Sequence, residues 1–537
     1  MRNISIFFMV RRNDELLKDT MSEIVNQSLQ KIAKGTGIIF VGTIIGMLLG
    51  FVGRVLLARF FTQAEYGIYS LALVLLNIFM TISLFGLQDG AARQIGYYRG
   101  KNDSLKVKGI IFSSIQIVLI ASIILSILLF FASDILSTKI FHDPALAAPL
   151  KVLAFAIPFL ALTQLFVSFF RGFESVKENV YFQNILRNVL FPAFLIPVVI
   201  LGLPFIDAIY AFAASIIITF VAFAFYVSKK IPLSLRDCKS NLVATNPVGK
   251  ELFFFSIPLL GSYMLSQIMT QTDTLMLGYF TTSDVVGLYN AAVPLARIIV
   301  TFLYSTHFMF IPITAKLYSQ NLTPELKRNY QILSKWVLFA VLPLFFVFMF
   351  FPEVILSSFF GVNYVKASLA LQILSVCFFI HVLMGPSGAA IISMGRTKFD
   401  LFVCSIGTAL NLLLNATLIP IWGINGAAIA TAFSLLTMHG LYSIKLYQIS
   451  RIHPFTKSYL TPFLTSSLII SLIYFVAKSF VTINTWTLLL LFVSFIATCI
   501  AVLILSKSIE EEDIMLLLTI ERRSGLNLVK NILKRFV

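Results

Sequence analysis

Three arginines lie inside long apolar stretches of this chain: Arg54, Arg187 and Arg297. An ionised side chain inside a membrane span is costly, so each arginine predicts either a function or a compensating partner. The planar guanidinium group matches phosphate oxygens in a two-pronged geometry. The indicated chemistry is therefore noncovalent binding of a phosphate-bearing molecule.

Arg297 belongs to a row of polar residues on one apolar segment. Its spacing from Asn290, Thr301 and Tyr304 follows the helical repeat, so these side chains fall on one narrow stripe. Such a stripe faces either water or another polar helix. We expect it to line a substrate cavity, and the alternative is a hydrogen-bond network between helices.

The preceding apolar segment carries a second polar arc. Gln267 and Gln271 belong to it, with Asp273 at its edge, and we expect both glutamines to line the same cavity. Asp273 and Arg54 fall at related places near the predicted outer ends of their spans. We predict that they form an ion pair that acts as a gate. The alternative is that each charge extends separately to the outer headgroups.

Two further charged positions lie on the predicted cytoplasmic side. Arg187 lies about two helical turns inside its span, where it could meet a substrate phosphate or extend to the inner surface. Asp89 and Arg93 are four residues apart, a spacing that predicts a local ion pair on one helix.

Enzyme signatures are absent from the chain. The five histidines do not show metal-ligand spacing, and neither a phosphate-binding glycine loop nor a GxSxG motif is present. The four cysteines form no CxxC pair and are expected to be apolar fillers. We therefore expect no catalytic residue, cofactor or metal. Energy for transport would come from an ion gradient, the membrane potential or the substrate gradient.

The elements that position these residues are long apolar segments. A helix that crosses a bilayer needs about 20 largely apolar residues. The sequence predicts an all-α polytopic membrane protein with 14 transmembrane helices, near residues 35–58, 66–87, 109–131, 152–170, 181–201, 205–227, 252–278, 285–310, 332–351, 367–390, 400–419, 424–444, 459–477 and 485–505.

Charge places these spans relative to the membrane. Most of the 41 Lys and Arg residues fall in alternate connections, and cytoplasmic loops are the ones that retain positive charge. Both termini are therefore predicted to be cytoplasmic in the cell membrane. The net charge of +17 would suit a nucleic-acid binder, but 58% hydrophobic and only 12% charged residues favour a membrane protein without a nucleic-acid partner.

The predicted organisation has six parts. They are a cytoplasmic N-terminal segment (1–34), an N-terminal six-helix lobe (35–227), a cytoplasmic linker (228–251), a C-terminal six-helix lobe (252–446), helices 13 and 14 (447–506) and a cytoplasmic amphipathic tail (507–537). The N-terminal segment does not have the pattern of a secretory signal, and translation from Met21 is an alternative.

The two lobes repeat each other at a separation of about 220 residues. Residues 61–69 read FTQAEYGIY, and residues 280–289 read FTTSDVVGLY. Asn188 and Pro197 recur in the same way as Asn411 and Pro420. The repeat holds six spans, an even number, so both copies enter the membrane in the same direction. Parallel repeats of this kind are typical of transporters with a substrate site between the halves.

Several of these phrases resemble those of a known family. The segments QTDTLMLG (271–278) and GLYNAA (287–292), and the later run from GRTK (395–398) to Gly426, are similar to the polysaccharide-transporter flippases of the MOP superfamily. The resemblance covers about residues 30–505. It implies two pseudo-symmetric six-helix lobes plus two C-terminal helices, with spans one, two, seven and eight lining a central cavity.

The resemblance also implies a function. The expected protein is a flippase that moves an oligosaccharide on a polyprenyl phosphate or diphosphate to the outer leaflet by alternating access, for cell-surface polysaccharide or glycan biosynthesis. Its expected partners are this lipid-linked oligosaccharide, membrane lipids and glycan-assembly enzymes. One alternative is an ion-coupled multidrug or small-molecule exporter of the same superfamily, although spans one to six lack deep acids. Another is a membrane glycosyltransferase or polysaccharide polymerase, which the short outer loops disfavour.

Overall fold

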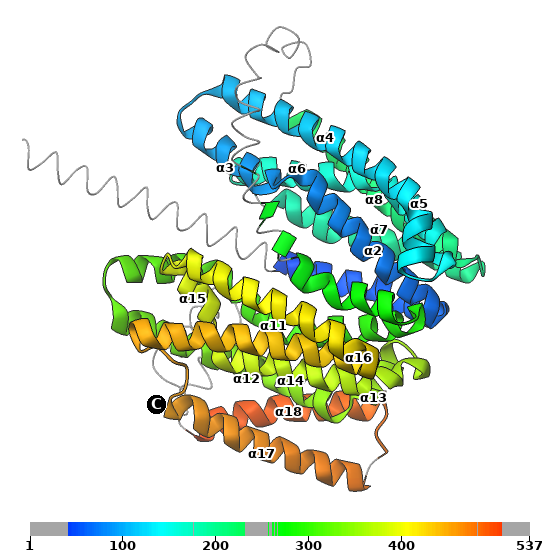
Figure 1. The fold of residues 1–537 in the computed structure, drawn as a ribbon. Coiled ribbons are helices and arrows are strands. Elements are labelled where there is room, and N and C mark those ends of the chain that lie inside the picture. The colour runs from blue at the N-terminus through cyan, green and yellow to red at the C-terminus, as the bar shows by residue number, and fades with distance from the viewer. Residues whose placement is uncertain are drawn as a thin grey trace, which may run out of the picture. The chain divides into compact units, whose positions relative to one another are not determined.

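A computed structural model describes residues 41–175, 177–230, 267–480 and 482–506, a few single positions from 256 to 265, and Ser508. All regular structure in these residues is helical (Figure 1). Eleven of the helices are long and apolar enough to cross a membrane, or up to 12 if a bent pair counts as one span. The predicted segment 1–34, the linker 228–251 and the tail 507–537 lie almost wholly outside the described residues.

The chain forms two compact units. Unit 1 comprises Met1–Leu56, Leu76–Phe131 and Leu150–Tyr263, and unit 2 comprises Leu57–Leu75, Ala132–Pro149 and Met264–Val537. Four helices include residues of both units: Val41–Phe60, α2 (Gln63–Leu84), α4 (Ser104–Ile135) and α5 (Ala147–Ala154).

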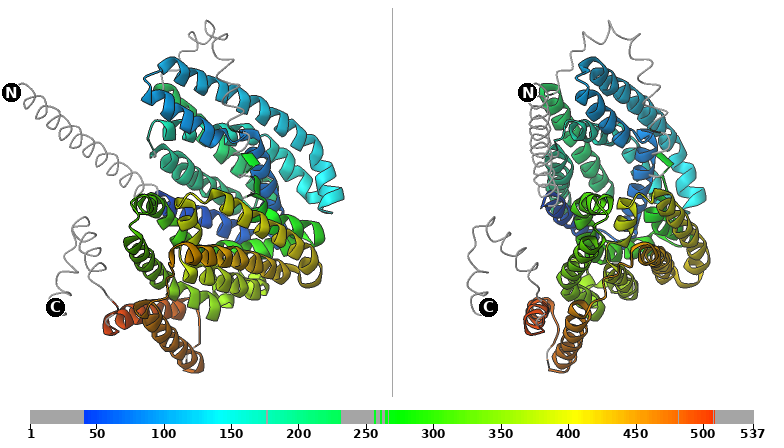
Figure 2. Two further views of the ribbon diagram at one scale, coloured as in Figure 1. Left: turned by 60° about the vertical axis from the view of Figure 1, so that its left-hand side comes forward. Right: turned by 90° about the vertical axis from the view of Figure 1, so that its left-hand side faces the viewer.

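Unit 1 is built largely from helices of the first half of the chain. After helix Val41–Phe60 come α3 (Leu87–Gly100), α5 (Ala147–Ala154), α6 (Ile157–Gly172), η3 (Asn179–Leu186), α7 (Arg187–Ile200) and α8 (Phe205–Lys230). Helices α5 and α6 are bent by 48° and together form the bent pair. Helix α6 packs against both α3 and α8 (Figure 2). Stacked aromatic rings fill the contact between α6 and α8, with the centroids of Phe170 and Phe223 5.8 Å apart.

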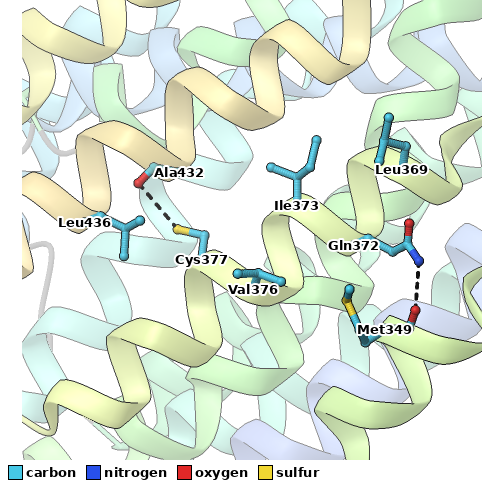
Figure 3. Close-up of a pocket in the computed structure, with 8 residues that line it drawn as sticks. All are labelled: Met349, Leu369, Gln372, Ile373, Val376, Cys377, Ala432 and Leu436. Atoms are coloured by element: carbon cyan, nitrogen blue, oxygen red, sulfur yellow. Dashed lines mark hydrogen bonds between the residues drawn. The ribbon is translucent and has the colours of Figure 1, made fainter.

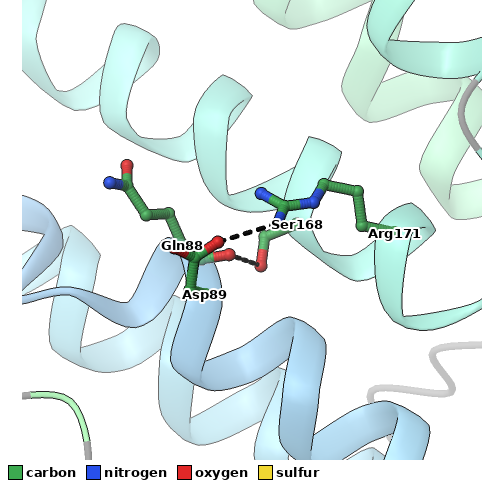
Figure 4. Close-up of polar contacts among 4 residues, drawn as sticks. All are labelled: Gln88, Asp89, Ser168 and Arg171. Carbon is green, nitrogen blue, oxygen red and sulfur yellow. Dashed lines mark hydrogen bonds and ion pairs between the residues drawn. The ribbon is translucent and has the colours of Figure 1, made fainter. Parts of the chain in front are cut away.

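Polar contacts join α3 to α6 at one end of unit 1. The Arg171 guanidinium forms an ion pair with Asp89 at 2.8 Å, and the Ser168 hydroxyl donates to the Gln88 carbonyl at 2.5 Å (Figure 4). The sequence pattern did not indicate the partner of Asp89 on α6, because the two residues lie 82 positions apart. The predicted Asp89–Arg93 pair stays a prediction.

A row of glycines lets helix Val41–Phe60 approach η3 and α7 closely. A Cβ at Gly46 would lie 2.8 Å from the Asn184 carbonyl oxygen, and one at Gly53 would lie 2.8 Å from the Phe191 ring. The Asn188 amide donates to the Gly46 carbonyl at 2.9 Å. Small residues four positions apart are a common basis of close helix packing in membranes.

Unit 2 contains most of the second half of the chain. Its main helices are α11 (Ser283–Ser319), α12 (Thr323–Phe350), α13 (Pro352–Phe359), α14 (Ser368–Met384), α15 (Ser387–Ser393), α16 (Thr397–Ser450), α17 (Lys457–Phe480) and α18 (Thr485–Leu505). Shorter turns are η1 (Leu136–Ile140), η2 (Pro144–Leu146) and η4 (Val362–Ala367). Helix α14 lies at the centre, packed against α11, α12 and α16, while α17 and α18 pack side by side.

Several helices are longer than the apolar windows that predicted them. Helix α11 continues from the predicted end at residue 310 to Ser319, and α12 begins at Thr323 instead of residue 332. Hydropathy detects only the apolar part of a helix, which can lie in the hydrocarbon core of the membrane. The backbone hydrogen bonds of the helix continue past that part.

Helix α16 contains two predicted spans, 400–419 and 424–444. Its backbone departs from helical geometry at Gly423, where φ is 53°. A Cβ at this left-handed position would be strained. The Pro420–Gly423 phrase of the sequence therefore marks a sharp change of direction between two helical segments.

Unit 2 also includes the turn that begins α2. The Arg59 side chain donates to the Phe359 carbonyl at 2.9 Å, and the Gln63 amide donates to the Asn363 carbonyl at 2.6 Å. The Tyr66 hydroxyl donates to the carbonyl of Asn290 at 3.2 Å. The first copy of the repeated FT…GxY phrase is thus hydrogen-bonded to the second half of the chain.

Candidate functional site

The polar stripe on α11 lies largely at the surface of the protein. Arg297 is exposed, Thr301 and Asn290 are partly buried, and Tyr304 is 49% exposed. One guanidinium nitrogen of Arg297 donates to the Thr270 carbonyl at 3.2 Å. Since the side chain remains exposed, further donors stay available to a ligand. The alternative of a closed interhelical network does not account for this exposure.

The structure brings Arg297 next to the predicted glutamines. Thr270 lies on the helical run 267–280, between Gln267 and Gln271, and both glutamines are partly buried. The Thr270 hydroxyl donates to the Gln267 carbonyl at 3.2 Å. Arg297, Gln267 and Gln271 therefore belong to one neighbourhood within unit 2.

Asp273 is buried in the interior of unit 2, and its expected place near the outer membrane surface stays a prediction. It is 8% exposed, and its carboxylate accepts four hydrogen bonds. The donors are the Tyr289 hydroxyl at 2.5 Å, the Thr431 hydroxyl at 2.5 Å, the Asn415 amide at 2.8 Å and the Asn411 amide at 3.4 Å. Counting residues along a span could not reveal this burial, since it depends on how α11 and α16 pack around the helix.

The partners of Asp273 were not predicted as site residues. Asn411 and Asn415 lie four positions apart on α16, and the Asn415 amide also donates to the Asn411 side-chain oxygen at 3.1 Å. Two asparagines on one face of an apolar span were the available signal, since polar residues inside spans usually need a partner.

This Asp273 cluster, formed by Asp273, Tyr289, Asn411, Asn415 and Thr431, is rich in oxygen atoms. The side-chain oxygen of Asn415 is buried without a hydrogen-bond partner among the described residues. Carboxylate, amide and hydroxyl oxygens suit hard cations, and a proton can neutralise the carboxylate as well. Either ligand would force the hydrogen bonds between helix 267–280, α11 and α16 to rearrange.

The other two predicted arginines belong to unit 1. Arg54 is partly buried near the end of helix Val41–Phe60, and Arg187 is partly buried where η3 passes into α7. The π-helical geometry of η3 directly precedes Arg187, and such segments often occur at functional sites. The pairing of Arg54 with Asp273 joins residues of different units and stays a prediction.

An apolar pocket of about 280 Å³ lies elsewhere in unit 2 (Figure 3). The Gln372 amide, its main polar side chain, is directed at the Met349 carbonyl at 2.8 Å, so the pocket offers little to a polar ligand. The lining residues come from α12, α14 and α16: Met349, Leu369, Gln372, Ile373, Val376, Cys377, Ala432 and Leu436.

Comparison with known proteins agrees with this fold. A family model described as "Polysaccharide biosynthesis protein" matches residues 32–318, and one described as "MatE" matches residues 258–417. The probable low-salt glycan biosynthesis flippase Agl15 of Haloferax volcanii is 27% identical over 462 residues, which cover 84% of this chain and 91% of that protein. An uncharacterized membrane protein of Methanocaldococcus jannaschii is 24% identical over 421 residues, 76% of this chain and 82% of its own length.

A solved structure shares the fold as well. The lipid II flippase MurJ in an inward closed conformation matches with a TM-score of 0.70 at 17% sequence identity, covering 89% of this chain and 100% of MurJ. The fold therefore defines the class: a multi-pass membrane protein with the architecture of MOP superfamily transporters.

The chain belongs to the polysaccharide biosynthesis protein family, whose model matches more than half of its residues. This confirms the predicted resemblance. It is a family of transporters and flippases, not of enzymes.

Proposed function

We propose that the protein moves a polyprenyl-(di)phosphate-linked oligosaccharide from the cytoplasmic to the outer leaflet by alternating access. Arg297 is the observation that carries this proposal. It is exposed on a membrane-crossing helix and has no ion-pair partner among the described residues. An ionised side chain inside a membrane span is energetically costly, so its presence there favours a role in binding an anionic ligand. The guanidinium geometry of arginine suits phosphate in particular.

The rest of the stripe supports a sugar-phosphate ligand. Asn290, Thr301 and Tyr304 add hydrogen-bonding groups along the same helix face, and Gln267 and Gln271 lie on the neighbouring helix. Arg187 is proposed to meet the phosphate from unit 1. The name of the Haloferax volcanii relative, a glycan biosynthesis flippase, agrees with this substrate class.

The proposed topology has 14 spans with both termini cytoplasmic. The break at Gly423 divides α16 into two of these spans, and the predicted span 252–278 lies partly outside the described residues. Together with the other candidate helices, these two features support the larger number.

The Asp273 cluster is proposed to supply the energy coupling. Binding of a proton or a monovalent cation at its carboxylate would alter the contact of α16 with helix 267–280. That helix also supplies the carbonyl that holds Arg297. Ion binding and substrate binding would thus act on the same helix, which is what coupling between two sites requires.

A reconstituted flipping assay tests the proposal. Proteoliposomes would carry a fluorescent polyprenyl-diphosphate monosaccharide, and its movement would be followed by chemical quenching from one side. We expect Arg297→Ala to abolish flipping while the protein still inserts, and Arg297→Lys to restore only part of it, since lysine loses the two-pronged geometry. Arg451→Ala is the matched control, because Arg451 lies just after α16. Full activity of Arg297→Ala would refute the role of Arg297.

The match of the MatE family model to residues 258–417 favours a second candidate, an exporter of small cationic molecules. Such a substrate would require an acid in place of Arg297 as its main contact. The test is saturable binding of a fluorescent organic cation. Binding that is intact in Arg297→Ala and abolished in Asp273→Asn would favour this function over the flippase.

A further inference from the structure

Three histidines that are far apart in sequence lie close together in unit 2. His307 is on α11, His381 on α14 and His439 on α16. The rings of His381 and His439 are stacked, with centroids 3.3 Å apart and planes inclined by 14°. The ring of Tyr304 meets both His307, at 5.4 Å, and His381, at 5.8 Å, edge to face.

The stacked pair is buried and incompletely hydrogen-bonded. His381 is 2% exposed and His439 is 8% exposed. The Nδ1 atoms of both rings and the Nε2 atom of His307 have no hydrogen-bond partner among the described residues. Such buried unpaired nitrogens are destabilising, so two facing imidazoles at this position call for a reason beyond packing.

A metal ion does not account for this arrangement. The lone pairs of an imidazole lie in the plane of its ring, so two stacked rings cannot direct them toward one point between the planes. The described residues also contain no group of three or more His, Cys, Asp or Glu side chains placed to hold a metal ion.

A proton accounts for it better. An imidazolium stacks favourably on a neutral imidazole, because a cation is attracted to an aromatic face. Two imidazolium rings at this distance would repel each other. We propose that His381 and His439 form a binding site for a single shared proton, whose uptake loosens the contact between α14 and α16.

The polar rings beside the pair are those of Tyr304 and His307 on α11 and that of Tyr442 on α16, whose centroid lies 6.0 Å from that of His439. Asp400 already accepts from Tyr442 at 2.7 Å, and Asp273 accepts its own four donors. A proton charge on the pair is therefore poorly compensated while α14 and α16 stay packed, and water or a wider gap would stabilise it.

Tyr304 links the pair to the polar stripe. Its ring meets that of His381 edge to face, and it is half exposed on the same helix face as Arg297. A proton on the pair would add a second positive charge near the polar stripe, in addition to that of Arg297. If the stripe binds an anionic headgroup, which rests on the proposed function, proton uptake would strengthen that binding.

Histidine NMR on the full-length protein measures the proton directly. The chain has only five histidines, so ¹⁵N-histidine labelling in lipid nanodiscs gives few signals, assigned with single His→Asn variants. We expect the signals of His381 and His439 to change together on acidification, with the uptake of one proton for the pair. The signals of His142 and His453, which lie in connections, serve as internal references. Two rings that stay neutral throughout, or that titrate separately, would overturn the proposal.

Native cysteines report the helix movement. Cys377 lies one turn before His381, with its sulfur 3.8 Å from the Ala432 carbonyl on α16, and Cys499 is buried on α18. The ratio of alkylation at Cys377 to that at Cys499, measured by peptide mass spectrometry, cancels most of the intrinsic pH dependence of thiols. If helix opening is coupled to the uptake of one proton, this ratio can rise by at most about tenfold for each pH unit of acidification.

We expect the ratio to rise on acidification in the wild type and in the control variant His453→Asn. It should stay flat in His381→Asn and His439→Asn. A flat wild-type ratio, or a rise that both variants retain, would refute the coupling of the proton to helix movement. The NMR titration is carried out on the wild-type protein and uses the variants only to assign its signals. Neither measurement needs substrate, so both are independent of the flipping assay.

Discussion

Gly67 and Gly287, which occupy matching positions of the sequence repeat, pack backbone against backbone in unit 2. A Cβ at Gly67 would lie 2.9 Å from the Gly287 nitrogen, and a Cβ at Gly287 would lie 3.2 Å from the Gly67 nitrogen. Each would also collide with a carbonyl oxygen, that of Ser283 or Gln63 respectively. The first turns of α2 and α11 therefore meet backbone to backbone. Such a contact is expected where an axis relates two parallel repeats.

Substitution at this contact is predicted to separate the two turns. Gly67→Val or Gly287→Val cannot fit against backbone atoms, which have no rotamer by which to move away. Ser283, now 6% exposed, should become accessible when the turns part. We expect a cysteine at position 283 to react with a maleimide slowly in an otherwise wild-type protein and much faster in either valine variant, with flipping reduced.

Two controls separate opening from unfolding. Gly388→Ala is a matched substitution, because its Cβ would meet Tyr442 only at an ordinary contact distance of 3.5 Å. Buried Cys499 on α18 should remain unreactive unless the whole unit unfolds. A cysteine at position 283 that stays protected in both valine variants would show that this contact does not hold the turns together.

The glycine row on helix Val41–Phe60 gives a prediction about stability. Gly46→Ala places a methyl group 2.8 Å from a carbonyl oxygen, whereas Gly50→Ala meets Asn188 at a comfortable 3.5 Å. Overpacking typically costs about 1–3 kcal/mol, so the melting temperature of the Gly46 variant in detergent should fall clearly below that of the Gly50 variant. Equal melting temperatures would mean that helix Val41–Phe60 can shift away from η3 without loss.

Membrane orientation is tested by single cysteines at exposed positions. Asn102 lies in a predicted cytoplasmic connection and Leu203 in a predicted outer one, and both are exposed. In intact cells an impermeant maleimide should label a cysteine at position 203 and leave one at 102 unlabelled until the cells are permeabilised. A cysteine replacing Ser524 tests the C-terminus in the same way. The reverse labelling pattern would invert the proposed topology.

Hydropathy and charge predicted the helical membrane fold, because a bilayer imposes one length and one composition on every span. They could not predict depth within a lobe. Asp273 and Arg297 are both charged residues in apolar helices, yet one is buried among four donors and the other is exposed. Sequence position specifies the helix face, whereas three of the four donors that surround Asp273 come from α16, more than 100 residues further along the chain.

The histidine pair shows the same limit. His381 and His439 lie 58 positions apart and have no ligand spacing along the chain, so only the packing of α14 on α16 brings their rings together. By contrast, the repeated FT…GxY phrase was visible in the sequence, because both copies must form the same turn. What the sequence did not show is that the two copies touch.

The predicted pair between Arg54 and Asp273 now needs a different test from a simple charge exchange. An arginine at position 273 would replace a hydrogen-bond acceptor with donors. These would face the donors Tyr289, Asn415 and Thr431. The charge-exchanged variant would therefore be unstable whether or not the pair exists. Neutral variants avoid this difficulty. Arg54→Gln and Asp273→Asn remove each charge while keeping approximate size.

A double-mutant cycle on flipping then isolates the coupling between Arg54 and Asp273. If the gate pair forms during the transport cycle, we expect the double variant to be less impaired than the sum of the single losses, with a coupling of about 0.5–3 kcal/mol. Asp273→Asn with Asn415→Ala is the positive control, because these side chains are in contact at 2.8 Å and must couple. Strict additivity for Arg54 and Asp273, with coupling in the control, would assign Asp273 to its hydrogen-bond cluster alone. Arg54 would then act independently of Asp273, as a single charge near the membrane surface.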